Sequence, residues 1–223
     1  MELQNAYTEQ SDQIAKMLMH GEEFRTLMCY YRGAMMEIET KFKVLNESMS
    51  ISHDRNPIET IKCRLKTPRS IVEKLQRKNC NVDLESIQHH VQDVAGIRVV
   101  CAFQEDVYLL AEFLLKQDDI QLVRVKDYIK CPKNNGYRSL HLIVKVPIFL
   151  SKEKRWMNVE IQLRTIAMDF WASLEHKMKY KKDLADAEEI SLELRKCAED
   201  IARLDREMQK LRNRIEGKDP RLL

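Results

Sequence analysis

A group of basic side chains between residues 61 and 77 is suited to bind phosphate. The short alternating segment "IKCRLK" carries Arg64 and Lys66, and Thr67 followed by Pro68 is typical of a helix start. On the helix that would follow, three polar residues recur at helical spacing and share one stripe: Ser70, Lys74 and Arg77. We therefore predict a helix N-terminus with a cationic stripe beside two further cations.

Two carboxylates further along the chain complement these cations. Asp93 and Glu160 offer the oxygen ligands that divalent ions such as Mg²⁺ prefer, and Arg98 adds another cation. Cations combined with a few acids form a common site for a nucleotide and its metal ion. Structural salt bridges to Arg64 or Arg98 explain the two acids equally well, so both interpretations stay open.

The segment "KNNGYRSLH", residues 133–141, holds more functional groups than a turn needs. Asn134, Asn135 and Gly136 tolerate the left-handed backbone of a tight turn. Tyr137 follows that turn and could present its ring for base stacking, although a buried tyrosine is the more usual outcome. The pattern indicates either a polar strand edge or part of a binding site.

The glycine pattern excludes the common backbone phosphate cradles. The 223 residues include only five glycines, and none forms G-x-x-x-x-G-K-[ST] or G-x-G-x-x-G. With a net charge of +3, the chain is not a uniformly basic nucleic-acid binder either. Any phosphate must therefore be bound by side chains.

The rest of the composition is typical of a cytoplasmic protein. No stretch approaches the roughly 18 apolar residues that span a bilayer. The six cysteines form no C-x-x-C pair, so neither a disulfide framework nor a zinc site is indicated. We expect one catalytic domain in a reducing cytoplasm, with no membrane partner.

Hydrophobic periodicity predicts an α+β domain. The expected order is helices, then β-α-β-β-β, then helices, with strands at "AGIRVVCAF", "IQLVRVKDYI", "LHLIVKVPIF" and "WMNVEIQLR". Only "LSKEKR" joins the last two strands, which suggests a hairpin. The sheet of about four or five strands should therefore be mixed rather than wholly parallel.

Three of these strands alternate between an apolar and a polar face. In "NVEIQLR" the apolar residues share one face, while Glu160, Gln162 and Arg164 share the other. Arg98 and His141 occupy the polar faces of their own strands. One face of the sheet could carry the site, and a sheet with one solvated side explains the alternation equally well.

Two long helices with heptad-like apolar seams flank this middle region. The first seam runs from Phe24 to Leu45 and the second from Ile190 to Ile215. Packing of each seam on the domain or on the other helix is as consistent with the pattern as a seam that joins subunits. Both ends are predicted to be scaffold.

Four segments resemble a known family, the RelA/SpoT homologue (p)ppGpp synthetases, and most closely their short members, the small alarmone synthetases of RelQ type. The segments are "NPIETIKCRLKTPRSIVEKLQRK", "HHVQDVAGIRVVCAF", "RVKDYIKCPKNNGYRSLHLIVKVP" and "VEIQLRTIAMDFWASLEHKMKYK". The resemblance extends from about Asn56 to Lys181, and "GYRSLH" combined with "EIQLRT" is highly specific.

This resemblance implies a GTP pyrophosphokinase whose nucleotidyltransferase-like mixed β-sheet is flanked by helices. ATP would donate its β,γ-pyrophosphoryl group to the 3′-hydroxyl of GDP or GTP, giving ppGpp or pppGpp and AMP. Arg64 and Arg98 would sandwich the adenine of ATP. The phosphates of ATP would be held by Lys66, Ser70, Lys74 and Arg77.

The same resemblance implies roles for the acids and for the loop. Asp93 and Glu160 would bind Mg²⁺, and Glu160 would also take the proton from the attacking hydroxyl. Tyr137 would stack on guanine, and the acceptor loop would be completed by Lys133, Asn135 and His141. Such transfers rely on positioning and charge neutralisation rather than on a covalent nucleophile.

The expected organisation is an N-terminal helical segment, residues 1–50, a synthetase domain, residues 51–182, and a C-terminal helical tail, residues 183–223, as oligomerisation element. We expect a homotetramer, with the alarmone product or single-stranded RNA as regulators. Long bifunctional members add a hydrolase domain with a His-Asp pair, for which this chain lacks the length. "SHDRNP" is therefore interpreted as a turn, and no hydrolysis is expected.

Two other functions compete with this one. In a catalytically silent RNA-binding oligomer, the basic side chains and Tyr137 would bind a single strand, but the carboxylates of Asp93 and Glu160 would gain nothing there. A nucleotidyltransferase that adds NMP to RNA or an antibiotic would need a Gly-Ser motif followed by paired aspartates, which is missing.

Overall fold

The structure, a computed structural model, describes residues 2–53, 55–178 and 187–217. The helices are α1 (Glu2–His20), α2 (Glu22–His53), α3 (Pro68–Arg77), α4 (Leu84–His90), α5 (Gln104–Leu115), α6 (Ile166–Met178) and α7 (Ala187–Ile215). The strands are β1 (Ile58–Leu65), β2 (Ala95–Cys101), β3 (Gln121–Asp127), β4 (Leu140–Phe149) and β5 (Lys154–Thr165). This order confirms the predicted helices, β-α-β-β-β run and final helices, and adds β1 before α3, a strand that the predicted order lacked.

The five strands form one mixed sheet in the order β1-β2-β5-β4-β3. Strands β2 and β5 run parallel, whereas the other three neighbouring pairs are antiparallel. The predicted hairpin joins β4 to β5, and the amide of Leu150 donates to the carbonyl of Glu153 across its turn, at 2.8 Å. The predicted α+β class with a mixed sheet is therefore confirmed.

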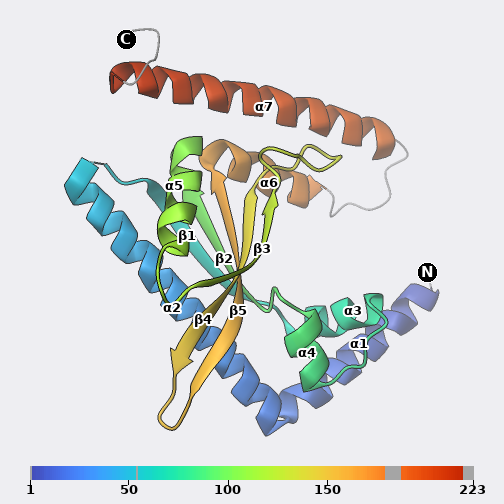
Figure 1. The fold of residues 1–223 in the computed structure, drawn as a ribbon. Coiled ribbons are helices and arrows are strands. Elements are labelled where there is room, and N and C mark those ends of the chain that lie inside the picture. The colour runs from blue at the N-terminus through green and yellow to red at the C-terminus, as the bar shows by residue number, and fades with distance from the viewer. Residues whose placement is uncertain (1, 54, 179–186, 218–223) are drawn as a thin grey trace.

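Helix α2 covers the apolar face of the sheet (Figure 1). Its predicted seam is buried there, and Tyr31, Ile38 and Phe42 are among the most deeply buried side chains. The first seam therefore packs on the domain itself. Residues from α5 and the sheet, such as Leu110 and Ile161, complete the same core.

The predicted turn at "SHDRNP" is wrong at its start, because α2 continues through Ser52 and His53. Asp54 lies outside the described residues. The helix runs on because no glycine or proline interrupts it before Pro57. Near this end, the side chain of Asn46 accepts a hydrogen bond from the amide of Ile58, at 3.1 Å, and so ties α2 to β1.

Helix α7 lies along one end of the sheet, where it contacts α5 and α6 (Figure 1). Most of its predicted apolar seam faces away from the domain, as the exposed side chains of Leu204, Met208 and Leu211 show. The buried stripe lies one residue further along the helix and includes Ala198 and Arg212. Among the described residues, no helix is long and apolar enough to cross a membrane.

Candidate active site

The polar face of the sheet presents two rows of side chains that cross all five strands. The first row, in strand order, is Arg64, Gly96, Glu160, Ile143 and Arg124. The second row is Lys62, Arg98, Gln162, His141 and Lys126. The predicted alternation of faces is therefore confirmed, and cations flank a central carboxylate on both sides.

A cavity of about 380 Å³ opens over β1, β2 and β5. Five residues singled out from the sequence line it: Arg64, Lys66, Asp93, Arg98 and Glu160. Because Gly96 has no side chain, nothing stands between Arg64 and Glu160 in the first row, and the floor of the cavity stays open. We call this space the donor cavity, after the ATP site that the family resemblance implies.

A second cavity, of about 210 Å³, adjoins the first. Its lining includes Lys74, Asp93, His141 and Glu160 from the predicted site. Further basic groups line it as well: Lys78, His90, Arg124 and Lys126. We call it the acceptor cavity, after the guanine nucleotide site that the family resemblance implies, and it shares Asp93 and Glu160 with the donor cavity.

Helix α3 begins as predicted, with Thr67 as N-cap and Pro68 in its first turn. The hydroxyl of Thr67 accepts from the amide of Ser70 at 3.3 Å and donates to the hydroxyl of Ser70 at 2.9 Å. Arg77 is exposed, and its Nε donates to the carbonyl of Glu73 at 3.3 Å. Neither Ser70 nor Arg77 lines the two cavities, and the same holds for Lys133, Asn135 and Tyr137, so these five predicted residues lie at the margin of the site.

Asp93 forms ion pairs with two lysines of the predicted site. The Nζ of Lys66 lies 2.9 Å from its Oδ2, and the Nζ of Lys74 lies 2.8 Å from its Oδ1. Burial raises the pKa of Asp93, but the hydrogen bonds and charges of the two lysines outweigh burial, so the net pKa is lowered. Asp93 is therefore a carboxylate at neutral pH, and it orients two cations toward the cavities.

Glu160 sits where the two cavities meet. Its Oε2 accepts from the Nε2 of Gln162 at 2.9 Å, and its Oε1 lies 3.5 Å from the Nδ1 of His141. Burial raises the pKa of Glu160, but the contacts with His141 and Gln162 lower it further than burial raises it. Glu160 is thus ionised at neutral pH and can attract a metal ion or a proton from a hydroxyl.

Two side chains hold Tyr137 in place through contacts with its phenol oxygen. The Nη2 of Arg164 donates to this oxygen at 2.8 Å, and the Nε2 of His141 lies 2.9 Å from it. Because a guanidinium can only donate, the phenol hydrogen is left for His141, whose other ring nitrogen then faces Glu160. The three residues Tyr137, His141 and Glu160 form a continuous polar chain.

The loop before Tyr137 makes the turn that the sequence predicts. Gly136 has φ +88°, and its amide donates to the carbonyl of Lys133 at 2.8 Å. The side chain of Asn135 bridges the amide of Tyr137, at 3.2 Å, and Glu175 of α6, at 2.9 Å. Asn135 therefore holds the loop in shape.

Two cations lie over the ring of Tyr137. The Nζ of Lys133 is 4.7 Å from the ring centroid, and the guanidinium carbon of Arg164 is 5.4 Å from it. Where a cation lies over a face of the ring, a base can stack on that face only if the cation moves aside. Lys133 is exposed on its loop, whereas Arg164 is almost fully buried, so Lys133 is the one free to move.

Arg164 is a buried residue beside the candidate site that the sequence did not single out as a site residue. It has only 2% of its surface exposed, and it also contacts the Oδ1 of Asp169 at 3.3 Å. The same oxygen of Asp169 lies 3.4 Å from Arg98 of the donor cavity. The alternation of "EIQLR" assigns Arg164 to the polar face, but only the fold reveals that it is a buried cation beneath Tyr137.

The two shared carboxylates fit a magnesium ion that takes its other ligands from a nucleotide. Mg²⁺ is commonly bound by one or two carboxylates together with substrate phosphates and water. Asp93 and Glu160 are both ionised and line both cavities. Among the described residues, no three His, Cys, Asp or Glu side chains gather as a metal site, so a metal held by protein ligands alone does not fit.

Comparison with known proteins identifies relatives over most of the chain. The family described as "Region found in RelA / SpoT proteins" matches residues 63–185. The chain is 40% identical over 195 residues to the GTP pyrophosphokinase YwaC of Bacillus subtilis (strain 168). The aligned residues make up 87% of this chain and 93% of YwaC.

Solved structures agree with this similarity. The small alarmone synthetase 1 of Bacillus subtilis, bound to its product pppGpp, superposes with a TM-score of 0.78 at 35% identity, over 88% of this chain and 100% of that chain. A GTP pyrophosphokinase family protein from Streptococcus pneumoniae gives a TM-score of 0.79 at 32% identity, over 89% of this chain and 97% of that chain.

Proposed function

Because the chain belongs to the RelA/SpoT family, we propose that its paired cavities bind ATP and a guanine nucleotide for pyrophosphoryl transfer. The chain is a GTP pyrophosphokinase, a (p)ppGpp synthetase of the small alarmone synthetase type. The observation that carries the proposal is that two adjoining cavities, both rich in cations, share the carboxylates of Asp93 and Glu160.

In the proposed reaction, the 3′-hydroxyl oxygen of GDP or GTP forms a bond to the β-phosphorus of ATP. The bond between that phosphorus and the oxygen bridging to the α-phosphate breaks, AMP leaves, and the hydroxyl loses its proton. Catalysis of such a transfer is mostly positioning and neutralisation of negative charge. The protein side chains proposed below supply both.

The donor cavity takes ATP. Arg64 and Arg98 lie on paired strands and would hold the adenine between their planar guanidinium groups. The phosphates would replace the carboxylate of Asp93 as partners of Lys66 and Lys74, which that carboxylate now orients. Ser70 and Arg77, at the margin, would contact the distal phosphates.

Mg²⁺ is the proposed metal ion, held by Asp93 and Glu160. When bound, it would neutralise charge on the transferred phosphates. Release of Lys66 and Lys74 from Asp93 to the phosphates would leave that carboxylate free to face the ion. Glu160 would accept the proton of the attacking hydroxyl, which its ionised state allows.

The acceptor cavity takes GDP or GTP. Guanine would stack on Tyr137 after Lys133 moves aside, and the freed ammonium would turn to the phosphates of the nucleotide. His141 would hold the ribose near Glu160, and Asn135 would keep the loop bent. Arg124 and Lys126, on the same cavity wall, would add positive charge for the 5′-phosphates.

The exposed seam of α7 supports a proposal on assembly. Leu204, Met208 and Leu211 form an apolar stripe that the domain does not cover. Burial of such a stripe against a second copy would stabilise an oligomer, and we propose a homotetramer. Light scattering that gives a monomer mass at micromolar concentration would count against it.

We further propose a cytoplasmic location and regulation by the alarmone product or by single-stranded RNA. Binding of each regulator can be measured by its effect on the rate of AMP release. A rate that does not respond to either ligand would remove that part of the proposal.

The experiment that tests the function uses purified protein with Mg²⁺, ATP and either GDP or GTP. We expect AMP and a guanosine nucleotide that carries a 3′-pyrophosphate, in equal amounts. Products that carry a transferred AMP would instead indicate a nucleotidyltransferase. Tight binding of single-stranded RNA without any product would favour the silent RNA-binding alternative.

A further inference from the structure

Helix α7 presses directly on the acceptor loop. A Cβ added to Gly136 would lie 2.5 Å from the Cβ of Ala198, closer than carbon atoms approach. The backbone of Arg195 lies 3.6 Å from the same point. A Cβ therefore has no room at Gly136, which also needs its left-handed φ of +88°, and beside this contact lies a cavity of only about 10 Å³ between α7 and the turn.

Two hydrogen bonds hold α7 against the elements that support Tyr137. The Nε1 of Trp171 in α6 donates to the carbonyl of Leu194 at 2.9 Å. The hydroxyl of Thr165 donates to the Oδ2 of Asp205 at 2.8 Å. Thr165 directly follows Arg164, which holds the phenol oxygen of Tyr137. The helix thus contacts both the loop and the strand end beneath the tyrosine.

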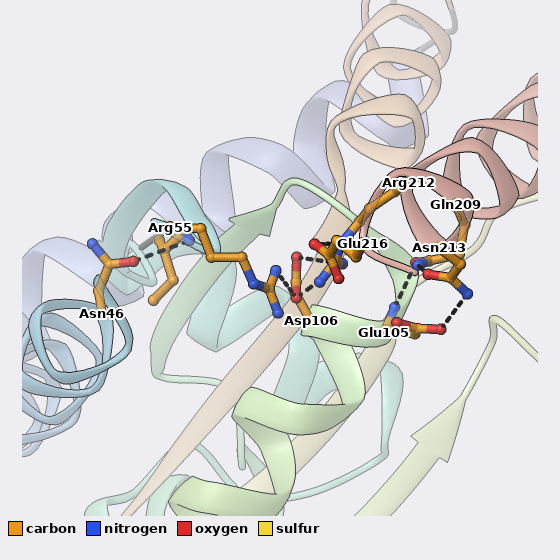
Figure 2. Close-up of polar contacts among 9 residues, drawn as sticks. Asn46, Arg55, Glu105, Asp106, Gln209, Arg212, Asn213 and Glu216 are labelled. Carbon is orange, nitrogen blue, oxygen red and sulfur yellow. Dashed lines mark hydrogen bonds and ion pairs between the residues drawn. The ribbon is translucent and has the colours of Figure 1, made fainter. Parts of the chain in front are cut away.

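The far end of α7 is anchored by a buried cluster of charges (Figure 2). Asp106, in the first turn of α5, is fully buried. The Nη1 of Arg55 lies 2.6 Å from its Oδ1, and the Nη1 of Arg212 lies 3.3 Å from the same oxygen. Glu216 contacts the Nε of Arg212 at 2.8 Å. A buried charge is costly without its partners, so this cluster resists any shift of α7.

Two further hydrogen bonds join α7 to Glu105, the residue of α5 before Asp106 (Figure 2). The amide of Glu105 donates to the Oε1 of Gln209 at 3.1 Å. The side chain of Asn213 donates to the Oε1 of Glu105 at 3.0 Å. Sliding α7 by one residue would break these contacts together with those of Arg212, so the register of the helix is well defined.

These contacts distinguish two parts of α7: the end near Arg212, which the charge cluster fixes, and the part near Ala198, which contacts the loop at Gly136. Ala198 and Arg212 are 14 residues apart, which corresponds to about 21 Å along a helix. The stripe that joins them is small or polar: Ala198, Ala202 and Arg212 are buried, and Asp205 and Gln209 are half-buried. The apolar seam proposed to join subunits is the neighbouring stripe, so the two surfaces of the helix can be tested separately.

We propose that α7 is a positioning element for the acceptor nucleotide: the Asp106 cluster sets the register of the helix, and Ala198 then sets the position of Gly136 and of the Tyr137 ring. The inference rests on the proposed role of Tyr137 in binding guanine. It assigns a function in the reaction to a helix that lies outside the region matched by the family, residues 63–185.

A graded series at Ala198 tests the proposal, because atoms that exceed the small cavity beside Ala198 push on Gly136. The variants are Ala198→Ser, Ala198→Val and Ala198→Leu. The control is Lys196→Leu, which introduces the same leucine side chain on the exposed side of α7. We expect the KM for GDP to rise with side-chain size, to about tenfold in Ala198→Leu, as overpacking displaces the loop. The KM for ATP should stay within about twofold.

A remote variant tests the anchor. Arg212→Met removes one partner of Asp106, and Arg214→Met, on the exposed surface, is its control. We expect the KM for GDP to rise about threefold in Arg212→Met without a matching rise for ATP, although Arg212 is far from the loop. An unfolded Ala198→Leu variant would leave the Ser and Val variants and Arg212→Met to decide.

Three outcomes would overturn the proposal. The first is a KM for GDP that does not respond to the size of residue 198 in an active series. The second is an equal rise in the KM for both nucleotides, which indicates general loosening of the fold. The third is a response in Lys196→Leu as large as that in Ala198→Leu. If the unaltered protein released no AMP, the proposed function would fail first, and calorimetric affinity for GDP across the same series would then judge the role of α7.

Discussion

The donor and acceptor halves of the cleft are built from different kinds of structure. In the donor half, Arg64 and Arg98 project from neighbouring hydrogen-bonded strands, and Lys66 directly follows the first of these strands. Tyr137 instead follows a loop, and its hydroxyl is held by Arg164, 27 residues later in the chain. Secondary structure thus preorganises the donor half, whereas tertiary contacts position the acceptor half and make it sensitive to distant changes.

The two halves meet at only a few side chains. Asp93 and Glu160 line both cavities, and Asp169 contacts Arg98 on one side and Arg164 on the other. Substitutions within one half should therefore change the use of one nucleotide, and substitutions at the meeting point should change the transfer itself. This difference can be tested by separate kinetic constants for ATP and GDP.

The largest effect is expected at Glu160, where the halves meet. Glu160→Gln keeps the shape of the side chain but removes its charge, so we expect kcat to fall about 10³-fold with both KM values within about threefold. Glu153→Gln, on the exposed β4–β5 hairpin, is the control. Steady-state measurement of AMP release at varied ATP and GDP checks this. Nearly full activity in Glu160→Gln would show that the assigned role is wrong.

Gly96 offers a test of the donor half that removes no charge. A Cβ there would meet only the carbonyl of Arg64, at an ordinary 3.6 Å, so β2 can accept a larger residue. In Gly96→Val the side chain would fill the open floor of the donor cavity, and we expect the KM for ATP to rise about 30-fold, the equivalent of overpacking by about 2 kcal/mol.

The comparison requires that Gly96→Val spare the acceptor half. The KM for GDP and the thermal midpoint should stay near those of the unaltered protein, and Gly96→Ala should give a smaller rise in the KM for ATP. A similar rise for both nucleotides would contradict a donor cavity that is preorganised independently of the loop.

Local signals were sufficient to predict most of the fold. The cap at Thr67 and Pro68 identified the start of α3, and strict alternation identified the polar face of β5. The seam of α7 was harder to interpret, because periodicity reports where apolar residues are, not what covers them. Its buried face depends on the ion pair of Arg212 with Asp106, which no local pattern reveals.

The candidate site divides in the same way. Arg64, Lys66 and Lys74 could be identified because regular spacing brings them to one place. Arg164 and Ala198 could not, because their importance depends on contacts with Tyr137 and Gly136 that exist only in the folded chain. Sequence reasoning therefore identified the groups that would touch a nucleotide more readily than the residues that hold those groups in place.

Arg164 tests the acceptor half from beneath. Arg164→Gln removes the cation that donates to the phenol of Tyr137, and hydrogen bonds to charged groups are worth about 1.5–3 kcal/mol. We expect the KM for GDP to rise about tenfold and the KM for ATP to change less, with Arg164→Lys between the two. Arg155→Gln, a half-buried arginine near the other end of the same strand, is the control. A larger effect on ATP than on GDP would mean that Asp169 couples Arg164 mainly to Arg98.

The smallest effect is expected at the cap of α3, and it separates stability from substrate use. Thr67→Ala should lower the free energy of unfolding by about 1 kcal/mol, because the amide of Ser70 loses its acceptor. The hydroxyl of Ser70 also loses the hydrogen bond from Thr67, so we expect the KM for ATP to rise about threefold. Asp83→Ala removes the matching N-cap of α4, because the side chain of Asp83 accepts from the amide of Ser86 at 2.7 Å. It should cost similar stability in urea unfolding but leave the KM for ATP unchanged, since α4 contributes no residue to the donor cavity. Equal changes in the KM for ATP in both variants would mean that the donor half responds to global stability, and not to the local geometry of α3.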